Sequence, residues 1–155
     1  MAGGCQVDFY VLDEGALSAE QLACRLALMA WEQGHQIAVI TETTDLAARL
    51  NDLMWEYPAG RFLPHSAEPG DTRAPVIIGN SDMTIPADSE VIINLTAAPI
   101  AGPDRFKRLL EIVPGSPSQR TASRHKFRSY RDQGLDPVSH PIGKRPGDKQ
   151  PGTTQ

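Results

Sequence analysis

The sequence has little of what stabilises or anchors many secreted and membrane proteins. Its 155 residues include only two cysteines, Cys5 and Cys24, and its four histidines are scattered without the spacing of zinc ligands. No run of about 18 apolar residues occurs, and the first ten residues lack the basic-then-apolar order of a secretory signal. These absences predict reduced thiols, no metal site, no membrane span and a cytoplasmic location.

The motifs of common nucleotide and nucleophile sites are also missing. After the first expected strand the chain reads LDEGALSAE, with one glycine beside two acids where a dinucleotide-binding loop needs several glycines. Neither GxxxxGK[ST] nor GxSxG occurs in the chain. We therefore expect neither a cofactor nor a catalytic activity, although a catalytic group assembled in space would leave no such motif.

Apolar patterns predict an alternation of strands and helices. Ser18 and Gln21 form a capping box at the start of one helix, and Gly34 follows its end. This order implies parallel strands joined by right-handed crossovers. We therefore expect an α/β fold with one mostly parallel sheet flanked by helices. The expected strands are 7–12, 36–41, 75–79 and 90–95, and the expected helices are 17–34 and 43–55.

The remaining segments are less regular. Residues 56–74 form a long irregular stretch, which is more often functional than idle, and residues 103–113 fit either a helix or a short strand. A further helix is expected over about 118–133. Residues 136–155 are rich in Pro, Gly and Lys and have few apolar side chains, which predicts a flexible tail. We therefore expect one folded domain, residues 1–135, followed by this tail.

The charge is divided between two parts of the chain. Residues 1–104 carry four arginines against fifteen acids, a net −11, whereas residues 105–155 carry eleven basic residues against four acids, a net +7. At about 100° per residue, four arginines and one aromatic residue of the expected 118–133 helix share a sector of about 100°. Like charges one turn apart are unfavourable, so this face is expected to receive an external anion. These residues are Arg120, Arg124, Phe127, Arg128 and Arg131.

The residues alone leave the anion open. A solvated surface helix is the commonest explanation of a charge run. Arginines beside an aromatic ring suit single-stranded nucleic acid, and equally an acidic peptide with an apolar end. The acidic first part of the chain slightly favours the peptide, because it would repel a polyanion. Besides a solvated helix, a nucleic-acid site and a peptide site, a degenerate nucleotide-using enzyme is a further interpretation.

Large apolar residues also gather around two prolines in the irregular stretch. They are either a satellite core under a long loop or an exposed patch for a permanent partner, and the sequence favours neither. The residues are Trp55, Tyr57, Phe62 and Leu63.

Several motifs together carry a family resemblance. They are VDFYVL, QIAVIT, LNDLMWEYPAGRFLPH, APVIIG, RFKRLLEIVPG and RHKFRSYRDQG, in this order from residue 7 to about residue 135. With these motifs the chain resembles the chi subunit of bacterial DNA polymerase III holoenzyme. The resemblance implies a Rossmann-like fold without a bound nucleotide and a non-enzymatic adaptor that supports DNA replication.

The resemblance also implies the partners. The psi subunit would tether the chain to the clamp-loader complex, and the chain would reach DNA only through the acidic C-terminal tail of single-stranded DNA-binding protein, which ends in aspartates and Ile-Pro-Phe. In some relatives a helicase-like competitor uses the aromatic patch. The residues that match the tail site are Val113, Arg120, Arg124, Phe127 and Arg128, and those that match the psi interface are Trp55, Phe62, Leu63 and Pro64.

Overall fold

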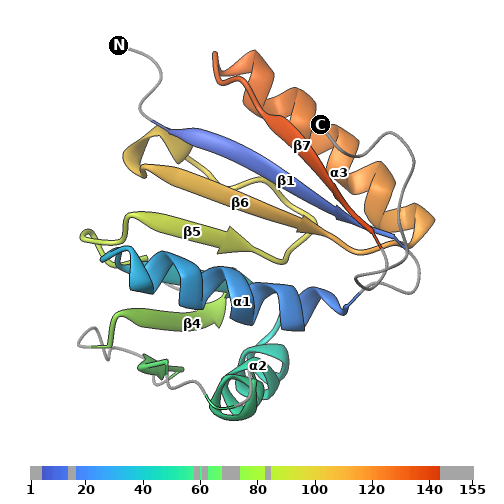
Figure 1. The fold of residues 1–155 in the computed structure, drawn as a ribbon. Helices are drawn as coiled ribbons and strands as arrows, with labels where there is room; N and C mark the ends of the chain where they lie inside the picture. The colour runs from blue at the N-terminus through green and yellow to red at the C-terminus, as the bar shows by residue number, and fades with distance from the viewer. Residues whose placement is uncertain are drawn as a thin grey trace.

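Parallel strands form a single seven-stranded sheet in the computed structural model (Figure 1). The structure describes residues 5–13, 17–57, 60, 63–67, 74–82 and 85–143. The strands lie in the order β3-β4-β2-β5-β6-β1-β7. This architecture confirms the expected α/β class with a mostly parallel sheet flanked by helices.

The strands are β1 Gln6–Leu12, β2 Ile37–Thr41, β3 His65–Ser66, β4 Val76–Asn80, β5 Val91–Asn94, β6 Arg108–Val113 and β7 Val138–Ile142. The helices are α1 Ala19–Glu32, α2 Thr44–Glu56 and α3 Pro117–Asp132, with a short 3-10 turn, η1, at Pro103–Arg105.

Local capping explains where the first two helices begin. Ser18 accepts a hydrogen bond from the Gln21 backbone N–H, and the Gln21 side chain accepts one from Ser18 N, so the predicted capping box is confirmed. Thr43 caps α2 in the same way through Leu46 N. Both helices therefore start at the carboxyl ends of the strands that precede them.

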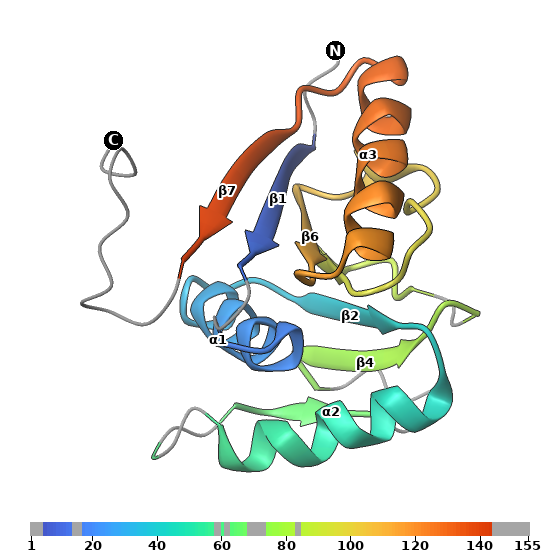
Figure 2. The same cartoon turned by 90° about the vertical axis from the view of Figure 1, so that its right-hand side faces the viewer.

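Two apolar layers cover the two faces of the sheet. Buried residues of α1 and α2 pack on one face, and Tyr130 of α3 packs with residues of the other face. Figure 2 shows α1 and α3 on opposite sides of the strands. Side chains alternate along each strand, so Phe9 of β1 lies on the α3 face whereas Leu12 lies on the α1 face.

The C-terminal strand corrects one expectation. Residues 136–155 were expected to form a flexible tail, but Val138–Ile142 form β7 and pair in parallel with β1. The prediction of a tail is therefore wrong for this strand, and the sheet extends past residue 135; residues 144–155 lie outside the described residues. Composition misled because an edge strand tolerates proline and few apolar side chains.

Polar contacts hold β7 in place. His140 Nε2 lies 2.8 Å from Asp8 Oδ1, and the rings of His140 and Tyr10 stack with centroids 5.1 Å apart. Ile142 O accepts from Asp13 N, which turns the backbone groups of the adjacent Pro141 toward the free edge of the sheet. Since proline has no N–H, this edge lacks a donor at Pro141, which discourages pairing with another strand.

Two smaller expectations are decided as well. The ambiguous segment 103–113 is a short 3-10 turn followed by β6, not a helix. Both cysteines are buried free thiols, and Cys5 packs in the α3-side core. Burial raises the pKa of Cys5 to about 11 and that of Cys24 to about 12, which keeps both thiols protonated at neutral pH.

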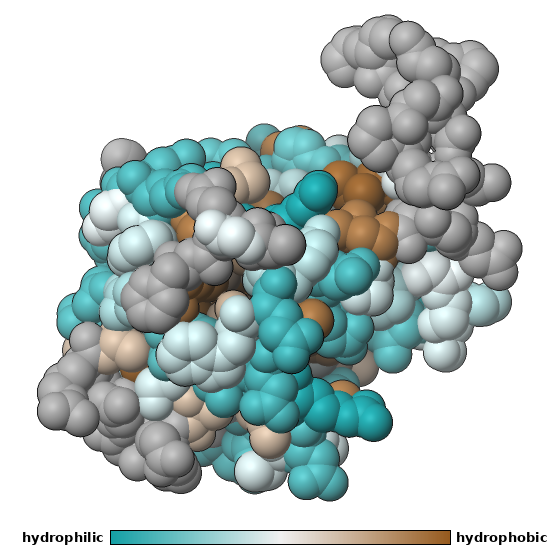
Figure 3. All heavy atoms as spheres, turned by 60° about the horizontal axis from the view of Figure 1, so that its bottom comes forward, coloured by the Kyte–Doolittle hydropathy of each residue, from teal (hydrophilic) through white to brown (hydrophobic). Residues whose placement is uncertain are grey.

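One face of the molecule can be judged from its space-filling view. The face seen in Figure 3 is largely hydrophilic, with apolar residues in small separate groups. Among the described residues, no helix has the length and apolar character needed to cross a membrane.

Candidate binding site on α3

The helix that carries the arginines is defined by its ends. Ser116 caps α3 by accepting from Gln119 N, and Pro117 occupies the first turn, where its missing N–H costs nothing. Gly134 follows the C-terminal end with a φ of +91°. Of the α3 side chains only Lys126 and Tyr130 are buried, so the arginines of this helix project outward.

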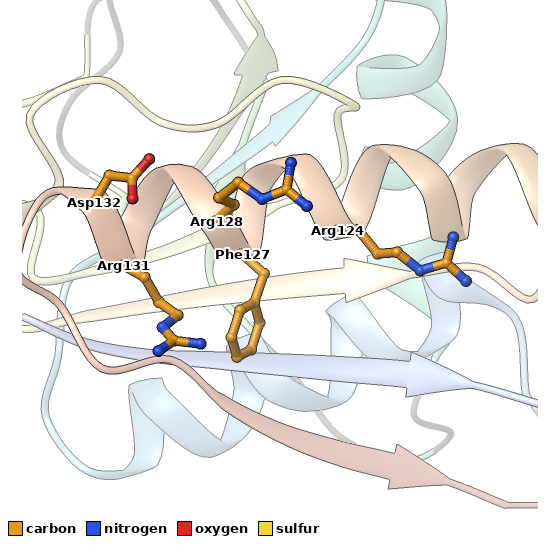
Figure 4. A pocket seen from close by; sticks show the side chains of 5 residues that line it. All are labelled: Arg124, Phe127, Arg128, Arg131 and Asp132. Carbon is orange, nitrogen blue, oxygen red and sulfur yellow. The ribbon is translucent and has the colours of Figure 1, made fainter.

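A cavity of about 460 Å³ lies against α3 (Figure 4). Figure 4 shows Phe127 and Arg131 projecting to the side of the helix where β1 and β7 run, whereas Arg128 and Asp132 project to the opposite side. Arg124, Arg128 and Arg131 form no ion pair with any described residue. The lining residues are Arg124, Phe127, Arg128, Arg131 and Asp132.

Phe127 forms the apolar part of this site. Its ring lies 5.2 Å from the Phe9 ring at an interplanar angle of 46°, and the side chain is half-buried against the α3-side core. An apolar group entering the cavity would meet a ring whose far side is already fixed in the core. The sequence predicted this aromatic residue among the arginines but not the support that Phe9 gives it.

The residues matched by resemblance fall into two groups. Arg124, Phe127 and Arg128 line the cavity together. Arg120 lies one turn earlier, where its Nη2 is 4.0 Å from Asp13 Oδ1, and Val113 is buried in the same apolar cluster as Phe127 without lining the cavity. Arg131 lines the cavity as well; its place in the 100° sector was visible in the sequence, but the family match did not include it.

A buried polar network lies beneath this surface. Lys126 Nζ lies 2.6 Å from Glu111 Oε1 and donates to Thr96 O at 2.7 Å. Tyr130 donates to Glu111 Oε2 at 2.5 Å, and Asn94 Nδ2 donates to the same oxygen at 2.9 Å. Burial raises the pKa of Glu111, and the Lys126 ammonium opposes that rise. Lys126 therefore does not belong to the exposed basic face, although it lies among the arginines in the sequence.

The aromatic patch has one exposed member. Trp55 on α2 is 56% exposed, and its ring lies 4.5 Å from the His65 ring. Leu63 is buried and Pro64 is half-buried, while Phe62 lies outside the described residues. The patch is thus part of the main core on the α1 side of the sheet, through Leu63, and part exposed surface, through Trp55.

The usual ligand position of this fold is small and acidic. Open α/β sheets bind nucleotides beyond the carboxyl ends of their strands. Here a cavity of about 60 Å³ follows β2 and β5, and Glu20 and Glu42 are among its lining residues. Two carboxylates would repel a phosphate, which agrees with the missing phosphate loop. No cluster of three metal-binding side chains occurs in the described part of the chain.

Fold and surface together define an α/β domain with a cationic helix face beside a cavity and without a nucleotide-binding loop. The family model described as DNA polymerase III chi subunit, HolC, matches residues 5–138. The chain belongs to this family.

Three relatives named DNA polymerase III subunit chi align with this chain over nearly their whole length. The DNA polymerase III subunit chi of Pseudomonas aeruginosa is 36% identical over 137 residues, which is 87% of this chain and 95% of that protein. The Escherichia coli subunit is 27% identical over 135 residues, 83% of this chain and 92% of that protein. The Haemophilus influenzae subunit is 25% identical over 141 residues, which is 87% of this chain and 96% of that protein.

A solved structure shares the fold alone. The crystal structure of T4 UvsW superposes with a TM-score of 0.64 at 9% identity, covering 91% of this chain and 42% of that one. At this identity the likeness concerns the arrangement of strands and helices, and the function rests on the site and the family.

Proposed function

We propose that this chain is a non-catalytic adaptor of the DNA polymerase III holoenzyme, working in the cytoplasm, that binds two proteins through separate surfaces. The face of α3 binds the acidic C-terminal tail of single-stranded DNA-binding protein. The patch around Trp55 binds the psi subunit and through it the clamp-loader complex. A helicase-like competitor for that patch would be a second partner.

One observation carries the tail site. Three arginines without an ion-pair partner among the described residues line one cavity together with a half-buried phenyl ring. Guanidinium groups bind carboxylates with two parallel hydrogen bonds, and the ring offers an apolar contact for the terminal Phe of the tail. An acidic tail with an apolar end matches both features at once.

The edge strand β7 is poorly suited to binding a partner by strand addition. Binding by strand addition uses the free backbone groups of an edge strand, but Pro141 removes a donor from the free edge of β7. Recognition would therefore depend on side chains of α3. Its charge pairs lie at the surface, so affinity should fall as salt screens them.

The patch around Trp55 supports the second surface. An indole ring exposed on a helix is a typical anchor of protein interfaces. Trp55 lies on α2, on the opposite face of the sheet from α3, so the two partners would not compete for space.

A gel-shift experiment with single-stranded DNA tests the proposal against its main rival. The chain alone should shift the DNA little, and a larger complex should form when single-stranded DNA-binding protein is present. Single-stranded DNA-binding protein that lacks its acidic tail should not form that larger complex with the chain. A strong shift by the chain alone would instead indicate that α3 binds nucleic acid directly.

A further inference from the structure

The buried network described above determines how α3 lies on the sheet. Lys126 is only 2% exposed, and its ammonium reaches Glu111 in the middle of the sheet. Tyr130, one turn later, binds the other oxygen of the same carboxylate. Two points one turn apart fix both the rotation of a helix about its axis and its position along that axis.

The partners of this pair come from several segments. Thr96 O accepts from Lys126, and Ile100 N donates to the Tyr130 hydroxyl at 2.8 Å. Asn94 on β5 binds Glu111 and also holds Thr96, whose N–H and hydroxyl both lie within 3.0 Å of Asn94 Oδ1. The segment after β5, the strand β6 and α3 are thereby joined through one carboxylate.

The exposed site depends on the same rotation. Phe127 follows Lys126 directly, and Arg124, Arg128 and Arg131 lie within about one turn of it. A helix turned by one residue, about 100°, would move the arginines away from their present directions and would leave Glu111 without its ammonium partner. The network thus favours one placement of the cationic face.

We propose that Glu111, Lys126 and Tyr130 are positioning residues of the tail site, which hold α3 at the rotation that presents Arg124, Phe127 and Arg128 to the acidic tail. The proposal rests on the proposed function and adds the residues that set the geometry of its site. A buried ion pair is often no more stabilising than apolar residues of similar size. Its contribution here is the definition of one helix placement.

The double variant Glu111→Gln/Lys126→Met removes both buried charges and nearly preserves both side-chain volumes. The amide that replaces the carboxylate can still accept from Tyr130, so no unpaired charge is left in the core. The matched control is Glu90→Gln/Lys107→Met, which removes an ion pair of 3.0 Å between the same residue types at the surface. Circular dichroism and thermal unfolding establish that both proteins are folded.

Two measurements follow on the folded full-length proteins. Hydrogen exchange should become faster in α3 of the double variant and stay unchanged in β1 and β6. Its affinity for a synthetic peptide of aspartates followed by Ile-Pro-Phe should fall about tenfold. Mutations of network residues that do not touch a ligand change coupling energies by amounts of this size. Its affinity should also depend less steeply on salt, because fewer arginines reach the peptide together. The control variant should show no selective change of exchange in α3 and should match the unmodified protein in affinity and salt dependence.

Each other outcome overturns a different claim. Unchanged exchange in α3 means that the pair does not hold the helix. Faster exchange with unchanged affinity and salt dependence means that the pair is structural without positioning the site, and faster exchange throughout the chain means that it acts only on overall stability. If the unmodified protein fails to bind the peptide, the proposed function fails, and the exchange data alone then decide whether the pair holds α3.

Discussion

The Phe127 ring packs on the Phe9 ring with centroids 5.2 Å apart, so an aromatic residue of the exposed helix is fixed by a buried strand. This contact places a firm apolar surface beside Arg124, Arg128 and Arg131, which have no ion-pair partner among the described residues. This combination favours the proposed binding face over a merely solvated one.

Arg124→Ala should weaken binding of the acidic peptide and leave psi association unchanged. Loss of one exposed charge pair costs about 1 kcal/mol or less, roughly fivefold in affinity at low salt. Isothermal titration at two salt concentrations measures the effect. The matched control is Arg49→Ala, which removes an exposed arginine from α2. Equal loss of both partners in the Arg124 variant would contradict two separate sites.

Phe127→Ala should act on the terminal Phe of the peptide. We expect a coupling of about 1 kcal/mol between the two rings, typical of aromatic pairs, in a double-mutant cycle with a peptide that lacks its last residue. Phe127→Tyr keeps the ring and should bind nearly as well as the unmodified protein. Additive effects of the two truncations would show that the tail's Phe lies elsewhere.

Trp55→Ala should reduce psi association and leave peptide binding intact. Truncation of an exposed Trp anchor typically costs about 2 kcal/mol, roughly thirtyfold in affinity. Met29→Ala is the matched control, since Met29 is 55% exposed on α1. Surface plasmon resonance with immobilised psi gives the psi affinity of both variants. An unaltered psi affinity would remove Trp55 from the interface.

Glu90 should make folding stability depend on pH in the acid range. Lys107, His35 and the Gln36 N–H lower its pKa from 4.5 to about 2. The folded protein therefore stays deprotonated at Glu90 while the unfolded chain takes up a proton, so this stabilising contribution is present above about pH 4.5 and is lost as the pH falls to about 2.

Urea unfolding of Glu90→Gln measures this effect. The difference in stability between the unmodified protein and the variant should shrink as the pH falls through that range. Glu56→Gln is the control, because Glu56 is exposed and forms no ion pair with a described residue. A difference that stays constant with pH would contradict the lowered pKa of Glu90.

Local signals predicted much of the fold. The capping box of Ser18 and Gln21 and the apolar runs of β2 and β5 depend on residues near one another in sequence, and each appears where it was expected. The strand β7 was missed because its main polar contact joins His140 to Asp8, 132 positions apart. Composition carries no information about such a partner.

The site was predicted as a stripe of charges, and its foundation was not. Lys126 lies on the same helix but outside the predicted sector, and it is buried and paired with Glu111. One signal was available: Glu111 stands inside the apolar run of β6, and a buried carboxylate needs a partner. Helical periodicity predicted that the unpaired arginines and Phe127 lie together, because they share one face of the helix.

The most direct test of the central claim is titration of the folded chain with a synthetic peptide of aspartates followed by Ile-Pro-Phe, and with the same peptide lacking its terminal Phe. The account predicts saturable binding of the complete peptide that weakens with salt, and much weaker binding of the shortened one. Equal binding of the two peptides, or none of either, would contradict a tail site built on Arg124, Phe127 and Arg128.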